Sequence, residues 1–351
     1  MRKFEPNLLP LHIGSIPHTD PQAACELVLG AFPQIPAWPQ LPERTFLENM
    51  YVQFSEGFPG LVLEDGGKHR ERIYVDRDQD LDPGLERLYL AYLENDLSYG
   101  ALSTDYAAGL AAFPQALSVA ERQPAVVKGQ VTGPISWGLT VVDQDRRPVL
   151  YDDILADALA KHLRLKAAWQ EEELRKIAPT TIVFIDEPYM SAFGSAYISL
   201  NREQVITLLE EVFAGLTGIK GTHCCGNTDW SVLLSTSAEV ISFDTYSYAQ
   251  AFSLYAGEVR AFLKHGGIIA WGIVPADDEK ALMNETVESL VARLHEAMDL
   301  LVRKGISFDD LINASLITPS CGLRTLSEKA AERAFELTAR VSEAMRERYG
   351  T

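Results

Sequence analysis

The sequence predicts an α/β protein folded as a single (β/α)8 TIM barrel. Short apolar runs typical of buried strands alternate with longer amphipathic patterns typical of helices, and this alternation favours a parallel sheet. Eight strand candidates can be counted, which is the number a closed barrel needs. The length of 351 residues is also in the range of one large barrel. We therefore expect one catalytic domain over 1–351.

The expected strands are recognised by apolar and β-branched runs such as "TTIVFI" and "GGIIAWGIV", bounded by polar or turn residues. In chain order they cover 8–15, 35–40, 124–134, 180–188, 218–225, 238–246, 266–275 and 316–322. Between them the apolar residues recur at helical spacing. The clearest helical patterns lie at 20–32, 152–178, 201–217 and 326–350.

Residues 41–121 interrupt the alternation after the second expected strand. This stretch is longer than an ordinary strand-to-helix connection. It contains "EDGGKH" (64–69) between two apolar segments, which indicates a β-hairpin. We expect the stretch to be an insertion near the mouth of the barrel and not a separate domain.

Composition excludes several classes of partner. There are 49 acidic and 31 basic residues, giving a net charge of −18. Such a surface repels phosphate backbones and anionic lipids, so we expect no nucleic-acid and no membrane binding. The apolar runs are too short to cross a bilayer, and no secretory signal is expected at the N-terminus, so the predicted location is cytoplasmic. Four cysteines do not make a disulfide framework.

The sequence "GTHCCGN" (221–227) contains the strongest chemical signal. His223 and Cys225 stand two residues apart at a strand end, so both side chains point to the same side. Asp244 ends the next expected strand, and Cys321 follows the last one. One nitrogen, two sulfurs and one oxygen form a ligand set suited to Zn²⁺. Alone, an H-x-C pair is more often a chance pairing of core residues, and the late cysteine is what favours a metal site.

Other cysteines and polar residues fit the same scheme. Cys224 and Cys25 are expected to pack in the core, as free cysteines often do. Polar residues cluster at the carboxyl ends of the expected strands, which a barrel brings into one ring. The ring would contain Ser15, Gln40, Thr132, Asp186, His223, Cys225, Asp244 and Cys321.

Several motifs, taken in order along the chain, resemble a known family. They are "LHIGSIP", "VTGP", "FIDEP", "THCCGN", "ISFDT" and "TPSCGLRT". Together they resemble the catalytic C-terminal barrel of cobalamin-independent methionine synthase, within the wider uroporphyrinogen decarboxylase and methionine synthase-like superfamily. The H-x-C-G-N motif also resembles methylcobalamin:coenzyme M methyltransferases. The resemblance covers essentially the whole chain.

The resemblance implies both a metal site and a substrate site. Its zinc ligands match His223, Cys225, Asp244 and Cys321, although the family has a glutamate where Asp244 stands. Its homocysteine site matches the turn Ile13, Gly14 and Ser15 together with Asp186, and Ser15 and Asp186 are the implied catalytic residues. A further family glutamate is matched by Gln40, with Glu43 as the second choice.

Unlike the full-length synthases, this chain shows no counterpart to their N-terminal half, which helps to hold the folate tail. We therefore expect a short, core methionine synthase that methylates homocysteine with Zn²⁺ as cofactor. The expected methyl donor is a corrinoid, either methylcobalamin or a corrinoid protein, and a folate of the 5-methyltetrahydrofolate type is the alternative.

Three other functions stay open. One is thiol methylation of coenzyme M, although Asp186 would repel its sulfonate. Another is a decarboxylase of the uroporphyrinogen type, which needs an arginine cluster that the early strands lack. The third is a non-catalytic zinc-binding or methyl-carrier partner protein.

Overall fold

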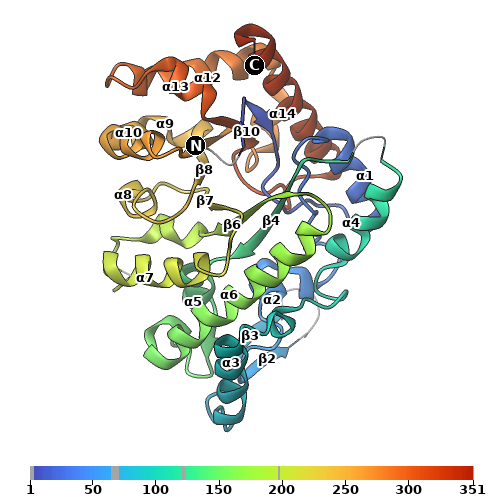
Figure 1. Ribbon diagram of the computed structural model, residues 1–351, viewed down its shortest axis with the longest axis vertical. Helices are drawn as coiled ribbons and strands as arrows, with labels where there is room; N and C mark the ends of the chain where they lie inside the picture. The colour runs from blue at the N-terminus through green and yellow to red at the C-terminus, as the bar shows by residue number, and fades with distance from the viewer. Residues whose placement is uncertain (1–3, 65–70, 121–122, 197, 351) are drawn as a thin grey trace.

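The structure is a computed structural model that describes residues 4–64, 71–120, 123–196 and 198–350. Its main sheet has seven strands, all parallel, in the order β1-β10-β9-β8-β7-β6-β4. Helices cover the outside of the curled sheet (Figure 1). The strands are β1 (Leu9–Pro10), β4 (Val126–Thr132), β6 (Thr180–Asp186), β7 (Ile219–Cys224), β8 (Val240–Asp244), β9 (Ile268–Val274) and β10 (Ser315–Pro319).

The helices follow the expected rhythm, and the four helical patterns named from the sequence are all confirmed. The α-helices are α1 (Pro21–Ala31), α2 (Met50–Gln53), α3 (Asp82–Glu94), α4 (Ala108–Ser118), α5 (Pro134–Thr140), α6 (Asp153–Arg175), α7 (Arg202–Phe213), α8 (Trp230–Leu233), α9 (Thr245–Phe252), α10 (Ala256–Lys264), α11 (Glu279–Asn284), α12 (Val287–Val302), α13 (Phe308–Asn313) and α14 (Glu328–Tyr349).

The expected second strand, 35–40, is not a regular strand, so the count of eight strands is not confirmed. Proline stands at positions 36, 39 and 42, and proline cannot donate to a sheet ladder. The segment still lies between the two edge strands of the sheet. It makes isolated parallel bridges, Ser15 with Gln40 and Ala37 with Lys128. The Lys128 N–H donates to the Pro36 carbonyl at 2.9 Å.

The interior of the curled sheet is apolar over most of its depth. A buried apolar cluster contains residues from the strands of this sheet and from the chain next to them. Its members are Leu11, Ile35, Val126, Ile182, Phe184, Ile219, Val240, Ile268, Ala270 and Leu316. A second, larger cluster fills the space between the sheet and the helices. The interior of the sheet is therefore filled by packed side chains, as in the core of a barrel.

Residues 41–121 form structure of their own. Strands β2 (Leu61–Glu64) and β3 (Arg72–Val75) pair antiparallel, which confirms the expected hairpin, while residues 65–69 of its turn lie outside the described residues. β3 also pairs with β5 (Val142–Asp143) to make a small second sheet. In Figure 1 this sheet and α3 lie at the opposite end of the molecule from α12 and α13. α4, at the end of the same stretch, packs against α1 in the outer layer.

Among the described residues, no helix combines the length and the apolar character needed to cross a bilayer.

Candidate functional site

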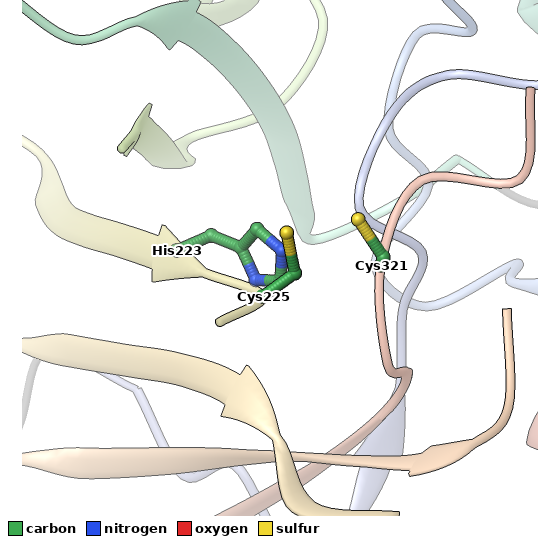
Figure 2. A group of neighbouring side chains, drawn as sticks. All are labelled: His223, Cys225 and Cys321. Atoms are coloured by element: carbon green, nitrogen blue, oxygen red, sulfur yellow. The ribbon is translucent and has the colours of Figure 1, made fainter. Parts of the chain in front are cut away.

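The structure brings His223, Cys225 and Cys321 together. His223 is the second-last residue of β7, Cys225 directly follows that strand, and Cys321 follows β10. Their ligand atoms all lie within 4.8 Å of one another. Figure 2 shows His223 and Cys225 on one side and Cys321 entering from the segment opposite. Nearly a hundred residues of chain separate Cys321 from the His223–Cys225 pair, and the parallel sheet makes them neighbours.

The imidazole of His223 is held in one orientation. Its Nδ1 is 2.9 Å from the Ser242 hydroxyl, and its Nε2 is buried with no described hydrogen-bond partner. Ser242 is the register partner of His223 on the neighbouring strand β8. A metal-binding histidine is commonly fixed in this way through its other ring nitrogen. The sequence analysis did not single out Ser242, although it lies on the same face of its strand as Asp244.

The two site cysteines lie close together. The proximity of Cys321 is the main reason why the pKa of Cys225 is lowered to about 4, with His223 helping. The proximity of Cys225, together with burial, raises the pKa of Cys321 well above its ordinary value. Cys225 is therefore the more acidic of the two thiols. Thiolates are the form in which cysteine binds soft metal ions.

The remaining cysteines lie in the core, as expected. Cys224 is fully buried and its sulfur faces the Gly226 carbonyl at 3.5 Å. Cys25 is fully buried on α1, and its sulfur lies 3.4 Å from the Gly109 carbonyl. Burial raises the pKa of both thiols, so neither is a ready nucleophile.

Asp244 is placed differently from the other three predicted ligands. It ends β8, and its Oδ1 accepts a 2.9 Å hydrogen bond from the Ser247 N–H, so it caps α9. The group of mutually close ligand atoms found among the described residues does not include it. Aspartate is a favoured N-cap residue, and this local role competes with metal binding. Burial raises the pKa of Asp244 to about 6. Its role as the fourth ligand stays a prediction.

A cavity of about 280 Å³ opens beside the His-Cys-Cys group. It is lined by most of the residues that the sequence predicts to bind the substrate. Its lining consists of Ile13, Ser15, Gln40, Met50, Asp186, Pro188, His223, Cys225, Ala276, Asp277, Cys321, Gly322, Arg324 and Thr325. The sequence analysis missed Met50, Asp277 and Arg324. Met50 belongs to the 41–121 stretch, and the other two belong to the loops after β9 and β10. No local sequence pattern specifies where these segments lie relative to the site.

Asp186 lies at the end of β6, where it is 9% exposed. Burial raises the pKa of Asp186 to about 6, an effect opposed by the nearby Lys128 and His223. Its Oδ1 is buried and has no hydrogen-bond partner among the described residues. A buried carboxylate oxygen without a partner is costly, so a cationic ligand group would be stabilised there.

Gly14 lies just beneath this wall of the cavity, where its backbone is in close contact with two side chains. A Cβ on Gly14 would lie 2.5 Å from the Gln40 Oε1 and 2.9 Å from the Gln130 Cδ, so no larger residue fits. The Gln40 Nε2 donates to Gln53 at 2.6 Å, which ties Gln40 to α2. Glu43, the second choice for this role, is exposed and does not line the cavity.

Glu187 and Trp137 are fully buried, and their contacts stabilise the fold. The Glu187 carboxylate accepts hydrogen bonds from the N–H groups of Ile135 and Ser136 at 2.9 and 2.7 Å, and from the Ser136 hydroxyl. It thus fixes the start of α5, and burial raises the pKa of Glu187 to about 7. Trp137 is fully buried, so its ring packs in the core and is not available to stack on a donor.

Comparisons with known proteins support the fold. No protein-family model matches the chain, and no curated protein matches it either. Among solved structures, a B12-independent methionine synthase from Shewanella sp. W3-18-1, in complex with selenomethionine, matches with a TM-score of 0.60 at 15% identity. The match covers 97% of this chain and 98% of that one.

Two further structures match over similar lengths. A methyltransferase from Methanosarcina mazei has a TM-score of 0.57 at 15% identity, covering 95% of this chain and 87% of that one. A putative vitamin-B12 independent methionine synthase from Listeria monocytogenes has a TM-score of 0.58 at 12% identity, covering 96% and 98%. Over almost its whole length, this chain therefore folds like B12-independent methionine synthases, the family that the sequence motifs resemble.

Proposed function

We propose that this protein is a zinc-dependent thiol S-methyltransferase that converts homocysteine to methionine. The observation that carries the proposal is the convergence of His223, Cys225 and Cys321 at the edge of a cavity that also contains Asp186. The similarity of fold to methionine synthases and to a methyltransferase supports the reaction class.

The donor atoms fit a zinc ion. One imidazole nitrogen and two sulfurs lie within 4.8 Å of one another, and the free His223 Nε2 is the nitrogen left for a metal. Three protein ligands with a fourth position for water or substrate is the pattern of catalytic zinc sites. Zinc, when bound, lowers the pKa of a coordinated thiol, so that a substrate sulfur there is a thiolate at neutral pH. In that state Cys225 and Cys321 would both be thiolates.

The residues around the metal site would hold the amino-acid part of the substrate. Asp186 would take the ammonium group, which gives its unpartnered Oδ1 a charged donor. The backbone N–H groups of the Gly14–Ser15 turn would take the carboxylate. The cavity of about 280 Å³ is just below the ~300–1,000 Å³ range of drug-sized pockets, so it suits a ligand as small as an amino acid.

The chemical step would be a direct displacement. The homocysteine sulfur forms a bond to the methyl carbon while the bond from that carbon to the donor breaks, and the donor leaves with the electron pair. The expected donor is methylcobalamin or a corrinoid protein, with methyltetrahydrofolate as the alternative. Two of the matching structures are described as B12-independent methionine synthases, and they lend no support to the corrinoid.

The test is a methyl-transfer assay on protein of measured zinc content, with homocysteine as acceptor and methylcobalamin or methyltetrahydrofolate offered separately. Methionine should form with at least one donor. C225S and C321S should lose zinc and turnover together, whereas C25S, which alters a core cysteine, should keep both. Full zinc and full rate in either site variant would refute the proposed centre.

Competing acceptors separate the alternatives. Coenzyme M should be a poor acceptor, because its sulfonate would lie beside the Asp186 carboxylate. Turnover of coenzyme M in preference to homocysteine would assign the protein to the other thiol. A zinc-loaded protein without turnover on any thiol would support a non-catalytic carrier.

A further inference from the structure

Lys128 is a fully buried lysine on β4, deeper in the sheet than the strand ends that border the cavity. It alternates with Gln130 and Thr132 along the strand, and Thr132 is the register partner of Asp186 at the rim. Its ammonium lies 4.5 Å from the centre of the Phe184 ring. A lysine is almost never buried without a specific partner, so its contacts need an explanation.

The Lys128 ammonium donates to neutral acceptors at the substrate turn. Its Nζ is 2.5 Å from the Ile13 carbonyl oxygen and 3.0 Å from the Gln130 Oε1. Gln130 in turn lies against the Cα of Gly14, where a Cβ would be only 2.9 Å from its Cδ. Lys128 therefore holds the turn both directly and through Gln130.

The geometry of the peptide bond gives this contact a direction. No cis peptide bond occurs among the described residues, so the Ile13–Gly14 peptide is planar and trans. In such a unit the C=O and the following N–H point in opposite directions. Because the Ile13 carbonyl points to Lys128, the Gly14 N–H points the opposite way, away from the Lys128 ammonium. The residues on either side of Gly14, Ile13 and Ser15, both line the cavity.

We propose that Lys128 is a positioning residue for the carboxylate of the amino-acid substrate: it fixes the Ile13–Gly14 peptide so that the Gly14 N–H faces the cavity, and it places a positive charge beneath that N–H. The inference rests on the proposed function, since it assumes a thiol with an α-carboxylate. A peptide whose oxygen contacts a cation is also more strongly polarised, which strengthens its N–H as a donor.

The competing cation is Arg324. It lines the cavity and is exposed, with no ion pair to a described residue. If the carboxylate were bound by the Arg324 guanidinium at the rim, Lys128 would have only a structural role. The two residues differ in position, because Lys128 is fully buried within β4 whereas Arg324 is exposed on the segment that follows Cys321.

The experiment compares two acceptors, homocysteine and 3-aminopropanethiol, which lacks the carboxylate, in wild type and variants. The ratio of their kcat/KM values measures recognition of the carboxylate. In K128M this ratio should fall at least tenfold, mainly through the KM of homocysteine. K128Q keeps a donor without the charge and should give a smaller fall.

Lys166 supplies a matched control. It is also a buried lysine, but it is on α6 and does not line the cavity. Its Nζ donates to the backbone carbonyl of Ala101 at 2.9 Å. K166M should leave the ratio unchanged while costing a similar amount of stability. An unchanged ratio in K128M and K128Q, an equal loss for both acceptors, or a collapse of the ratio in R324Q but not in K128Q would overturn the proposal.

Binding separates failure of this inference from failure of the proposed function. Calorimetric titration with methionine and with 3-(methylthio)propylamine needs no methyl donor. If wild type neither binds methionine nor methylates homocysteine, the proposed function is wrong. If wild type does both and K128Q keeps the full preference for methionine over the amine, only the role of Lys128 is wrong.

Discussion

Asp186 and His223 are direct register partners at the ends of the neighbouring strands β6 and β7. The proposed ammonium-binding carboxylate therefore lies beside the proposed metal-binding imidazole, as side-by-side residues of one sheet. If both proposed roles hold, this pairing would set a short distance between the ammonium and the sulfur of the substrate, which would favour a small amino-acid thiol over a long one. The following predictions test the residues on each side of this pair.

Asp186→Asn should weaken binding of homocysteine by roughly 10- to 150-fold. The reason is that a hydrogen bond to a charged group contributes about 1.5–3 kcal/mol. The measurement is the KM, or the dissociation constant of methionine. The deamino thiol 4-mercaptobutanoate should be affected far less, and an equal effect on both thiols would show that Asp186 does not bind the ammonium.

Ser242→Ala should lower zinc affinity by about 10- to 100-fold while leaving the protein folded. The Ser242 hydroxyl holds the His223 Nδ1, and losing such a contact to a metal-binding histidine typically has this effect. Zinc affinity is measured by competition with a chelator. Ser342→Ala, which alters a buried serine bonded to the Leu8 carbonyl, is the control and should keep wild-type affinity.

Asp244→Asn should distinguish the helix-capping role of Asp244 from its predicted role as a metal ligand. Asparagine caps helices as well as aspartate does, so the free energy of unfolding of the metal-free protein should change by less than about 0.5 kcal/mol. Zinc affinity should fall at least tenfold if Asp244 is the fourth ligand. Unchanged zinc affinity would restrict Asp244 to capping α9, and Asp244→Ala should then cost about 1 kcal/mol of stability alone.

His162 should make stability depend on pH. Burial, with Lys166 nearby, lowers the pKa of His162 to about 3, below the 6.5 of an unfolded histidine. Between these values the unfolded state binds more protons, so this contribution to stability is complete above pH 6.5 and is lost as pH falls toward 3. The slope is about 1.4 kcal/mol per pH unit.

His162→Gln removes this titration and keeps an amide that can donate to the Phe54 carbonyl. Urea unfolding at pH 8, 6 and 5 should show that the variant is less stable at pH 8 and that the difference shrinks as pH falls below 6.5. A difference that stays constant across this range would mean that His162 is protonated in the folded protein.

The local sequence was sufficient for the parts of the fold that depend on short-range patterns. Apolar runs predicted the buried strands, and helical periodicity predicted α1, α6, α7 and α14. The H-x-C spacing placed His223 and Cys225 together, because an extended chain returns to the same side every second residue. The position of Cys321 after a late strand was enough to expect it near them, since the carboxyl ends of parallel strands meet at one face.

Other features depended on neighbours that are distant in sequence. The segment 35–40 looks apolar enough for a strand, but its prolines remove ladder donors, and only its place between β1 and β4 preserves two single bridges. Asp244 has the sequence position of a ligand and the local geometry of a helix cap. Glu43 is close to Gln40 along the chain, yet its side chain is exposed.

The sequence by itself predicted the candidate site residues and the strand ends at which they lie, because these follow from spacing and hydrophobic periodicity. Only the tertiary structure decided that Ser242 orients His223, that Lys128 contacts the Ile13 carbonyl, and that the 41–121 stretch contributes Met50 to the cavity. The physical reason is that strand register and side-chain packing join segments far apart in the chain, and no local pattern specifies those contacts.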